Sequence, residues 1–249
     1  MSGHNRWSKI KRAKAVVGAA KGKLFTKIIK ELTVAARMGG GDPAGNARLR
    51  TAMLAAREAN MPSDTITRAI KKGTGELEGV AYEEVVYEGY GPGGVAMLVE
   101  CLTDNLNRTA SDIRTTFSKG AGNLGAPGSV KFIFHKKGSI LVKPGPTEDA
   151  VMDKAIEAGA EDVINQGEDG FEVRCAAADL HAVATALEKA GLALGEQKWT
   201  YVPQTTVKLE GDAAKKLLRL VEALEDHDDV QNVYANFEID EALMAELSA

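Results

Sequence analysis

Cationic side chains recur at helical spacing near the start of the chain, and Lys and Arg are the residue types that bind phosphate groups. Wound as an α-helix, residues 23–37 place four cations within an arc of about 80°, opposite an apolar arc of about 140°. Val34 is the one apolar residue on the cationic side. The cations are Lys23, Lys27, Lys30 and Arg37, and the apolar arc holds Leu24, Phe25, Ile28, Ile29, Leu32, Ala35 and Ala36.

Such a face is ordinarily a solvated helix surface, so the surrounding segments decide how it is interpreted. Residues 3–14 carry five positive charges and no negative one, with few apolar residues. We expect this arm to be mobile alone and to become ordered on a partner. Trp7 could stack on a base or anchor the arm to the helical core, and both interpretations stay open. The predicted nucleic-acid-binding residues are Arg6, Trp7, Lys9, Lys11, Arg12, Lys14, Lys21, Lys23, Lys27, Lys30, Arg68, Lys71 and Lys72.

The net charge of −4 conceals a strong asymmetry along the chain. Residues 1–80 contain 16 Lys and Arg against 6 Asp and Glu, a balance of +10. The remaining 169 residues contain 15 against 29, a balance of −14. This distribution predicts a polyanionic partner for the first part and only solubility for the second. The acidic charge of residues 81–249 argues against a protein whose whole surface binds nucleic acid.

The acidic run Glu225–Asp229 places four carboxylates and one histidine in five residues. Hard metal ions bind carboxylates, so a metal-dependent enzyme centred here is one hypothesis, although the glycine and spaced glutamate of a calcium loop are missing. Acids at the end of a helix also oppose the helix dipole. We favour a contact between this run and a basic patch, such as the protein's own N-terminal helices.

No other motif predicts catalysis. Residues 120–125 match the G-x-G-x-x-G string, but a helix precedes it and a strand follows, the reverse of a dinucleotide site, so we expect a mobile connector. The histidines have no spacing typical of a catalytic triad or a metal site. We therefore expect no enzymatic activity and no cofactor. The four histidines are His4, His135, His181 and His227.

Hydropathy and cysteine usage indicate a cytoplasmic protein. No stretch reaches the ~18 consecutive apolar residues of a membrane span, so no membrane partner is expected. We expect neither a secretory signal nor a transit peptide. Cys101 and Cys175 stand alone in apolar runs and are predicted to be buried thiols in a reducing compartment.

The predicted elements begin with three short helices that form a small all-α bundle. The second is capped by Asn46, and the third runs from Pro62 to Lys72 and ends at Gly73. The pattern then changes to strands at 83–87 and 95–101, joined by a glycine-rich turn at 89–94. A helix over 106–119, capped by Asp104, follows them.

Strands and helices alternate over the rest of the chain. They indicate an α+β multidomain protein with two units of split β-α-β, ferredoxin-like type, the middle one discontinuous. The predicted domains are residues 1–75, residues 80–130 with 205–240, and an inserted domain at 131–204. The predicted elements are strands at 129–134 and 139–142 around a turn at 135–138, a helix at 148–158, a strand at 170–175, a helix at 178–190, and a strand, helix and strand at 205–209, 212–224 and 230–237.

Blocks of sequence along almost the whole chain resemble the YebC family, also called the YebC/PmpR family of regulatory proteins. One departure is Asn5-Arg6, where the family more often has Ser-Lys. The matching blocks are Gly3–Trp7 (Gly-His-x-x-Trp), Lys21–Lys27, Asn60–Pro62, Arg68–Thr74, Tyr87–Gly94, Thr103–Thr109, Gly122–Gly125, Gly128–Val130 and Asp228–Asn236.

This resemblance implies an N-terminal helical domain, two α+β domains of which the middle one is discontinuous, a cytoplasmic location and no catalytic residues. The family has been described both as DNA-binding transcriptional regulators and as translation factors acting at the ribosome. Lys and Arg contacts to phosphates carry no sequence information, so they cannot choose between DNA and ribosomal RNA. Our leading hypothesis is a non-enzymatic, nucleic-acid-binding regulator, a DNA-binding transcriptional regulator. The alternative is a ribosome-associated translation factor that binds ribosomal RNA.

Overall fold

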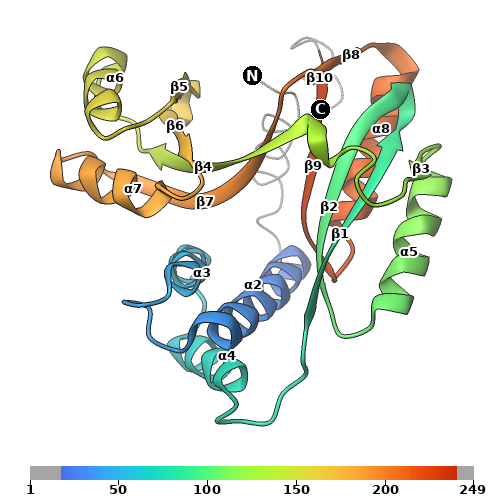
Figure 1. Ribbon diagram of the computed structural model, residues 1–249, viewed down its shortest axis with the longest axis horizontal. Coiled ribbons are helices and arrows are strands. Elements are labelled where there is room, and N and C mark those ends of the chain that lie inside the picture. Colours follow the sequence, from blue (N-terminus) through green and yellow to red (C-terminus); the bar gives the residue numbers. More distant parts are fainter. Residues whose placement is uncertain (1–17, 240–249) are drawn as a thin grey trace. The chain divides into compact units, whose positions relative to one another are not determined.

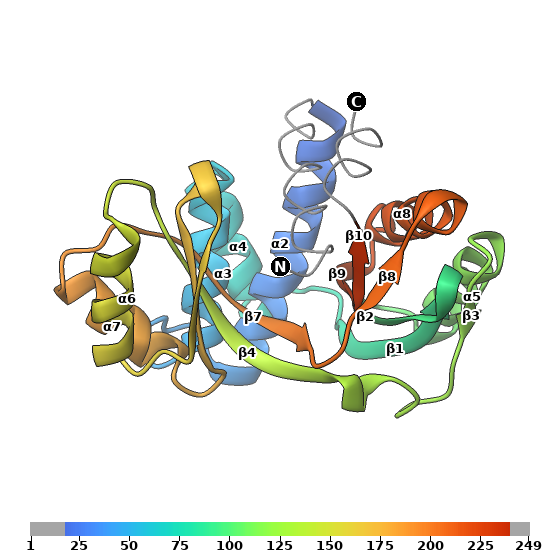
Figure 2. The same cartoon turned by 90° about the horizontal axis from the view of Figure 1, so that it is seen from above.

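The computed structural model describes residues 18–239 and shows an α+β protein with seven α-helices in that range. Two compact units make up this part of the chain (Figures 1 and 2). The first contains helices α2–α4, a four-stranded sheet and the C-terminal strands, and the second is built on His135–Val202. The three predicted domain boundaries stay predictions. Between residues 18 and 239, no helix combines the length and the apolar character needed to cross a membrane.

Three helices open the first unit: α2 (Gly18–Gly39), α3 (Ala47–Glu58) and α4 (Ser63–Thr74). The predicted cap of α3 is confirmed, because Asn46 Oδ1 accepts a hydrogen bond of 3.0 Å from the Leu49 N–H. The same side chain donates to the carbonyl of Ala35 at 2.7 Å. Asn46 therefore starts one helix and ties it to the preceding one.

The prediction that Gly73 ends the third helix is wrong. Helix α4 continues to Thr74, and Gly75, with a φ of 83°, takes the left-handed position that ends it. Gly73 serves the packing of α4 on α2 instead, because a Cβ atom at this position would lie 2.3 Å from the carbonyl oxygen of Thr33. A glycine does end α4, but it is Gly75. Gly73, two residues earlier, is required by the close packing of the two helices.

Substituting Gly73→Ala is expected to destabilise the first unit. The added methyl group must push α2 and α4 apart, and such overpacking costs about 1–3 kcal/mol, against a gain of ~1 kcal/mol from alanine's helix propensity. Gly22→Ala is the matched control, since Gly22 also lies in a helix but has open space around it. Thermal unfolding should show a lower Tm for Gly73→Ala and an equal or higher Tm for Gly22→Ala. Equal behaviour of the two variants would contradict the close packing.

The sheet of the first unit has the strand order β3-β1-β2-β9. Strands β1 (Glu83–Gly91) and β2 (Val95–Thr103) form the predicted antiparallel hairpin around a 3-10 turn at Pro92–Gly94. The short β3 (Asn123–Leu124) pairs with β1, and β9 (Val230–Ala235) returns to pair antiparallel with β2. The last strand, β10 (Phe237–Ile239), pairs in parallel with β8 (Val207–Leu209).

Helices α5 (Leu106–Lys119) and α8 (Gly211–Glu225) cover one face of this sheet (Figure 1). Their apolar sides and alternate residues of β2 and β9 form a single core, in which Met97, Phe117 and Leu217 are fully buried. The predicted cap of α5 is wrong: Asn105, not Asp104, accepts a 3.0 Å hydrogen bond from the Arg108 N–H. Asp104 instead pairs with the Arg108 side chain at 2.6 Å.

The glycine-rich connector after α5 is tied to β1, which differs from the expected mobile segment. Gly125 donates to the carbonyl of Glu88 at 2.7 Å. The buried Glu88 carboxylate accepts hydrogen bonds from the backbone of Gly128, Val130 and Lys131, at 2.6, 2.8 and 2.8 Å. Burial acts to raise the pKa of Glu88, but these hydrogen bonds outweigh it and hold the pKa below its ordinary value.

The second unit has a sheet of order β5-β6-β4-β7, and helices α6 (Glu148–Glu157) and α7 (Leu180–Lys189) share its core. The predicted turn at 135–138 is wrong, because β4 runs unbroken over Phe134–Val142, and Gly138 lies in the strand opposite Cys175. The predicted strand before it is a 3-10 turn at Lys131–Ile133. The strands are β4, β5 (Asp162–Asn165), β6 (Phe171–Ala176) and β7 (Leu194–Pro203), of which β5 and β7 were not predicted.

Both cysteines are buried free thiols, as the sequence predicted. Burial, with a smaller effect from the Asp229 carboxylate, raises the pKa of Cys101 to about 12. Burial likewise raises the pKa of Cys175 to about 11. Because the reactive form of cysteine is the thiolate, both side chains are packing residues of their cores.

Candidate nucleic-acid interface

Three of the predicted phosphate-binding residues are exposed together on α4. Arg68, Lys71 and Lys72 are related by three and four residues, so they share one side of the helix. Among residues 18–239 their side chains have no hydrogen-bond or ion-pair partner. Lys71 and Lys72 lie in the last turn, where cations are also favourable to the helix dipole. The predicted residues of the arm, Arg6, Trp7, Lys9, Lys11, Arg12 and Lys14, lie outside the described residues.

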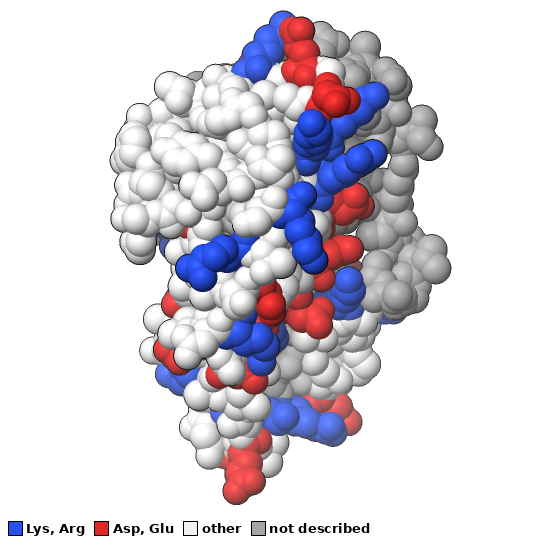
Figure 3. Space-filling view, turned by 90° about the vertical axis from the view of Figure 1, so that its right-hand side faces the viewer, with Lys and Arg blue, Asp and Glu red and all other residues white. Residues whose placement is uncertain are grey.

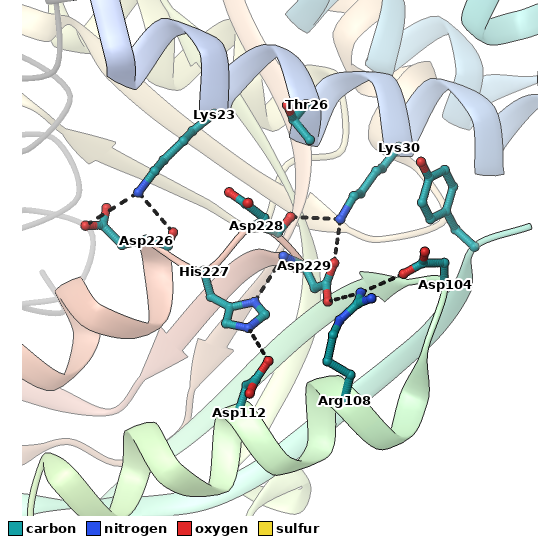
Figure 4. A pocket seen from close by; sticks show the side chains of 11 residues that line it. Lys23, Thr26, Lys30, Asp104, Arg108, Asp112, Asp226, His227, Asp228 and Asp229 are labelled. Carbon is teal, nitrogen blue, oxygen red and sulfur yellow. Dashed lines mark hydrogen bonds and ion pairs between the residues drawn. The ribbon is translucent and has the colours of Figure 1, made fainter. Parts of the chain in front are cut away.

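The cationic side of α2 contacts an acidic segment of the same chain. Lys23 Nζ donates to the carbonyl of Asp226 at 3.2 Å, and Lys27 Nζ donates to the carbonyl of Glu225 at 2.7 Å. The Asp226 carboxylate lies 3.9 Å from Lys23 Nζ. The predicted contact between the acidic run and the N-terminal helices is therefore confirmed (Figure 4). Lys21, by contrast, is exposed, with its ammonium 5.6 Å from the centre of the Phe25 ring.

Lys30 differs most from its predicted role. Its side chain is 9% exposed and its ammonium lies 2.6 Å from Oδ1 of Asp229, whose side chain is 6% exposed. The same ammonium donates to the carbonyls of Asp228 at 3.0 Å and Leu102 at 3.3 Å. All three donor positions of the ammonium are thus used inside the protein. The Lys30 ammonium is therefore bound by acceptors of the same chain, and its predicted contact with phosphate stays a prediction.

Asp229 is the centre of this buried polar network. Its Oδ2 accepts hydrogen bonds from the hydroxyl of Thr109 at 2.8 Å, from Arg108 at 3.0 Å and from the hydroxyl of Thr103 at 3.2 Å. Burial acts to raise the pKa of Asp229, but the bonds from Lys30, Thr109 and Arg108 outweigh it and depress the pKa strongly. The carboxylate joins α2, α5 and the start of β9.

A pocket of about 570 Å³ opens between α2, α5 and the turn before β9 (Figure 4). Carboxylates outnumber cations on its walls, so its field does not favour phosphate. His227 spans one wall, with Nε2 3.4 Å from Asp112 and Nδ1 accepting from the Asp229 N–H at 3.1 Å. Within the described part of the chain, no three His, Cys, Asp or Glu side chains are placed to hold a metal ion. The walls are Lys23, Thr26, Lys30, Tyr82, Asp104, Arg108, Asp112, Asp226, His227, Asp228 and Asp229.

Sequence reasoning missed Asp229, Thr109 and Arg108 as partners. Thr109 and Asp229 are 120 residues apart, and no spacing rule joins positions so distant. The available signal was indirect, since both belong to sequence blocks that resemble one family. Those blocks show where this chain resembles the family, but they do not show which blocks contact one another in the fold.

Comparisons with known proteins cover nearly the whole chain. Residues 5–76 match the family model of the TACO1/YebC protein N-terminal domain, and residues 82–237 match that of the TACO1/YebC second and third domain.

Relatives and a solved structure are similar over the same length. A "Probable transcriptional regulatory protein" of Myxococcus xanthus is 66% identical over 247 residues, 99% of each chain. One of the same name from Acidithiobacillus ferrooxidans is 56% identical over 249 residues, which is 100% of this chain and 99% of the relative. The crystal structure of a conserved hypothetical protein from Aquifex aeolicus superposes with a TM-score of 0.84 at 49% identity, covering 90% of this chain and 92% of the other. The chain therefore belongs to the TACO1/YebC family.

Proposed function

We propose that this protein is a nucleic-acid-binding regulator of gene expression, acting as a DNA-binding transcriptional regulator without catalysis. The observation that carries the proposal is the exposed set Arg68, Lys71 and Lys72 on one side of α4, within a segment of charge +10. Full-length relatives named as probable transcriptional regulatory proteins support a regulatory role. The proposed site combines these three residues with Lys21 and the cations of the arm at 6–14.

The structure narrows the set of cations available to a partner. Lys23 and Lys27 are held by the acidic run, and Lys30 is buried against Asp229, so α4 offers the more accessible charges. Contacts from Lys and Arg to phosphates supply affinity and depend steeply on salt, while contacts to base edges supply sequence specificity. We therefore assign to α4 the positioning of nucleic acid and not the reading of its sequence.

We also propose the finer architecture that the sequence pattern indicated. In that architecture a helical domain at 1–75 precedes two split β-α-β domains, and the middle domain is completed by the C-terminal strands. The return of β9 to pair with β2 supports the discontinuous arrangement. Limited proteolysis should cut first near residues 75–81 and near the two ends of the 131–204 segment.

Charge reversal of the α4 set should weaken nucleic-acid binding. In the variant Arg68→Glu/Lys71→Glu/Lys72→Glu, three phosphate contacts are lost. The negative slope of log K against log salt should therefore become shallower by about 2 to 3. Fluorescence anisotropy with a labelled DNA duplex and with a ribosomal RNA fragment measures both affinities. The matched control is Lys143→Glu/Lys189→Glu/Lys208→Glu, which reverses the same number of exposed charges elsewhere.

The two probes also separate the proposal from its alternative. Tighter binding to the DNA duplex, lost in the α4 variant and kept in the control, supports transcriptional regulation. Binding that is confined to ribosomal RNA and survives moderate salt would support the translation-factor alternative instead. An α4 variant that binds as tightly as the control would overturn the assignment of these residues.

A further inference from the structure

A second group of cations lies on α8, in the part of the chain where acidic residues predominate. Lys216 and Arg219 are exposed and Lys215 is partly exposed, and the i, i+3 and i, i+4 spacings place the three on one side of the helix. Their spacing is that of Arg68, Lys71 and Lys72 in reverse order. Over residues 18–239 the side chains of Lys215 and Arg219 have no hydrogen-bond or ion-pair partner. Lys216 has only a 3.9 Å contact with the exposed Asp212, and such surface pairs contribute little.

The helix dipole does not account for the cations of α8. Cations stabilise the C-terminal end of a helix and acids the N-terminal end. In α8 an acid, Asp212, lies in the first turn and Glu225 ends the helix, while Lys215, Lys216 and Arg219 lie between the two end turns, where the dipole has little effect. Lys216 is placed to pair with Asp212, whereas no contact within the described chain accounts for Lys215 and Arg219.

The end of α5 brings a fourth cation to the same place. A Cβ atom on Gly120 would lie 2.7 Å from Cδ1 of Leu220, so the backbone that follows Lys119 touches the middle of α8. At the other end of the pair, His227 approaches Asp112 at 3.4 Å, which shows that α5 and α8 run antiparallel. Lys119 is exposed and, within the described chain, also has no ion pair. The backbone of Lys119 therefore lies close to α8.

Figure 3 views the molecule from the side on which α5 lies in Figure 1. Lys and Arg side chains gather in a band over the upper part of this face, with a smaller number of Asp and Glu side chains beside them. Cationic and acidic side chains thus lie beside one another on this face.

We propose that Lys119, Lys215, Lys216 and Arg219 form a second phosphate-binding surface, the α8 surface, which contacts the sugar-phosphate backbone of the same nucleic acid. This inference rests on the proposed function and extends it from the N-terminal helices to the α+β part of the unit. Phosphate is the partner that four flexible cationic side chains favour. The exposed acids of the same helix, Asp212 and Glu222, are fewer than these cations. In this proposal that part of the chain contributes binding as well as the expected solubility.

The test is the full-length variant Lys215→Glu/Lys216→Glu/Arg219→Glu, measured by anisotropy with a DNA duplex and with the RNA duplex of the same sequence. Loss of phosphate contacts should make the negative slope of log K against log salt shallower by about 2 to 3. Binding near 0.1 M salt should weaken roughly tenfold or more. The Tm should change little, because these side chains are exposed or partly exposed and surface substitutions away from caps and packed contacts have small effects. A loss of binding without a loss of stability is thus the expected signature.

The control Lys143→Glu/Lys189→Glu/Lys208→Glu and the α4 variant make the result decisive. If wild type binds and the α8 variant matches the control, the α8 surface is overturned while the proposed function stands. If wild type binds neither duplex, both fail. If the reversed variant loses thermal stability, Lys215→Gln/Lys216→Gln/Arg219→Gln carries the same test, with a smaller expected loss of slope. If the variant loses affinity for both duplexes, the α8 surface binds the sugar-phosphate backbone that DNA and RNA have in common. If it loses affinity for only one, that duplex is the nucleic acid that the surface prefers.

Discussion

The substitution Asp229→Asn should lower the free energy of unfolding by about 3–5 kcal/mol, because it leaves the Lys30 ammonium buried without its counter-charge. Lys30 and Asp229 are both nearly inaccessible to water, at 9% and 6% side-chain exposure, so solvent cannot replace the lost partner. Asparagine keeps the shape of the side chain but turns one acceptor toward Thr109 and Arg108 into a donor. Urea unfolding followed by far-ultraviolet circular dichroism measures the change.

Asp228→Asn is the matched control for this experiment. The side chain of Asp228 is exposed, and only its backbone carbonyl accepts from Lys30, so this variant should stay within about 0.5 kcal/mol of wild type. Hydrogen exchange adds a local measurement, since loss of the pair should speed exchange in α2 and in β9. Equal stability of the two variants would mean that the buried pair does not hold these elements together.

Sequence periodicity predicted the existence of most elements because their signals are local. Asn46 caps α3 through a contact three residues away, and the hairpin of β1 and β2 is closed by neighbouring glycines. Both features depend on residues close in sequence, which is the range over which such signals act.

The two errors that concern glycines share one physical cause, which is tertiary contact. Gly73 looked like a helix end because glycine commonly ends helices, but its missing side chain admits the backbone of Thr33. Gly138 looked like a turn residue, yet it lies within β4, where an added Cβ would come 2.7 Å from Cys175 Sγ. In each case a distant segment requires a small residue, and no local pattern reveals that segment.

The candidate site illustrates the same limit for charge. The helical wheel divided α2 into an apolar face and a cationic face, as if only one side were covered. The structure buries Val34 and Lys30 as well, at 1% and 7% residue exposure, so α2 is covered on more than one side. The wheel identified which residues lie together, whereas the partner of the cationic side was a segment about 200 residues away. Charge balance predicted an anionic partner but could not show that part of the anionic charge lies within the same chain.

Acid should weaken the first unit, and Asp229 should account for a measurable part of that loss. The pKa of Asp229 is depressed in the folded protein, so the unfolded chain binds more protons and stability increases with pH in this range. The contribution is complete above the ordinary pKa of 3.8 and is lost as the pH falls below that value toward the depressed one. Wild type should therefore lose stability steeply as the pH is lowered below about 4.

The variant Asp229→Asn isolates this contribution, because it cannot lose a carboxylate charge at position 229. Glu88 also has a depressed pKa and remains in both proteins, so its effect cancels in the comparison. The difference in unfolding free energy between wild type and variant should be largest at pH 6 to 7 and should shrink steadily between about pH 4 and pH 2. Urea unfolding at closely spaced pH values measures it. A difference that stayed constant down to pH 2 would show that the carboxylate charge of Asp229, and with it the ion pair to Lys30, does not stabilise the fold.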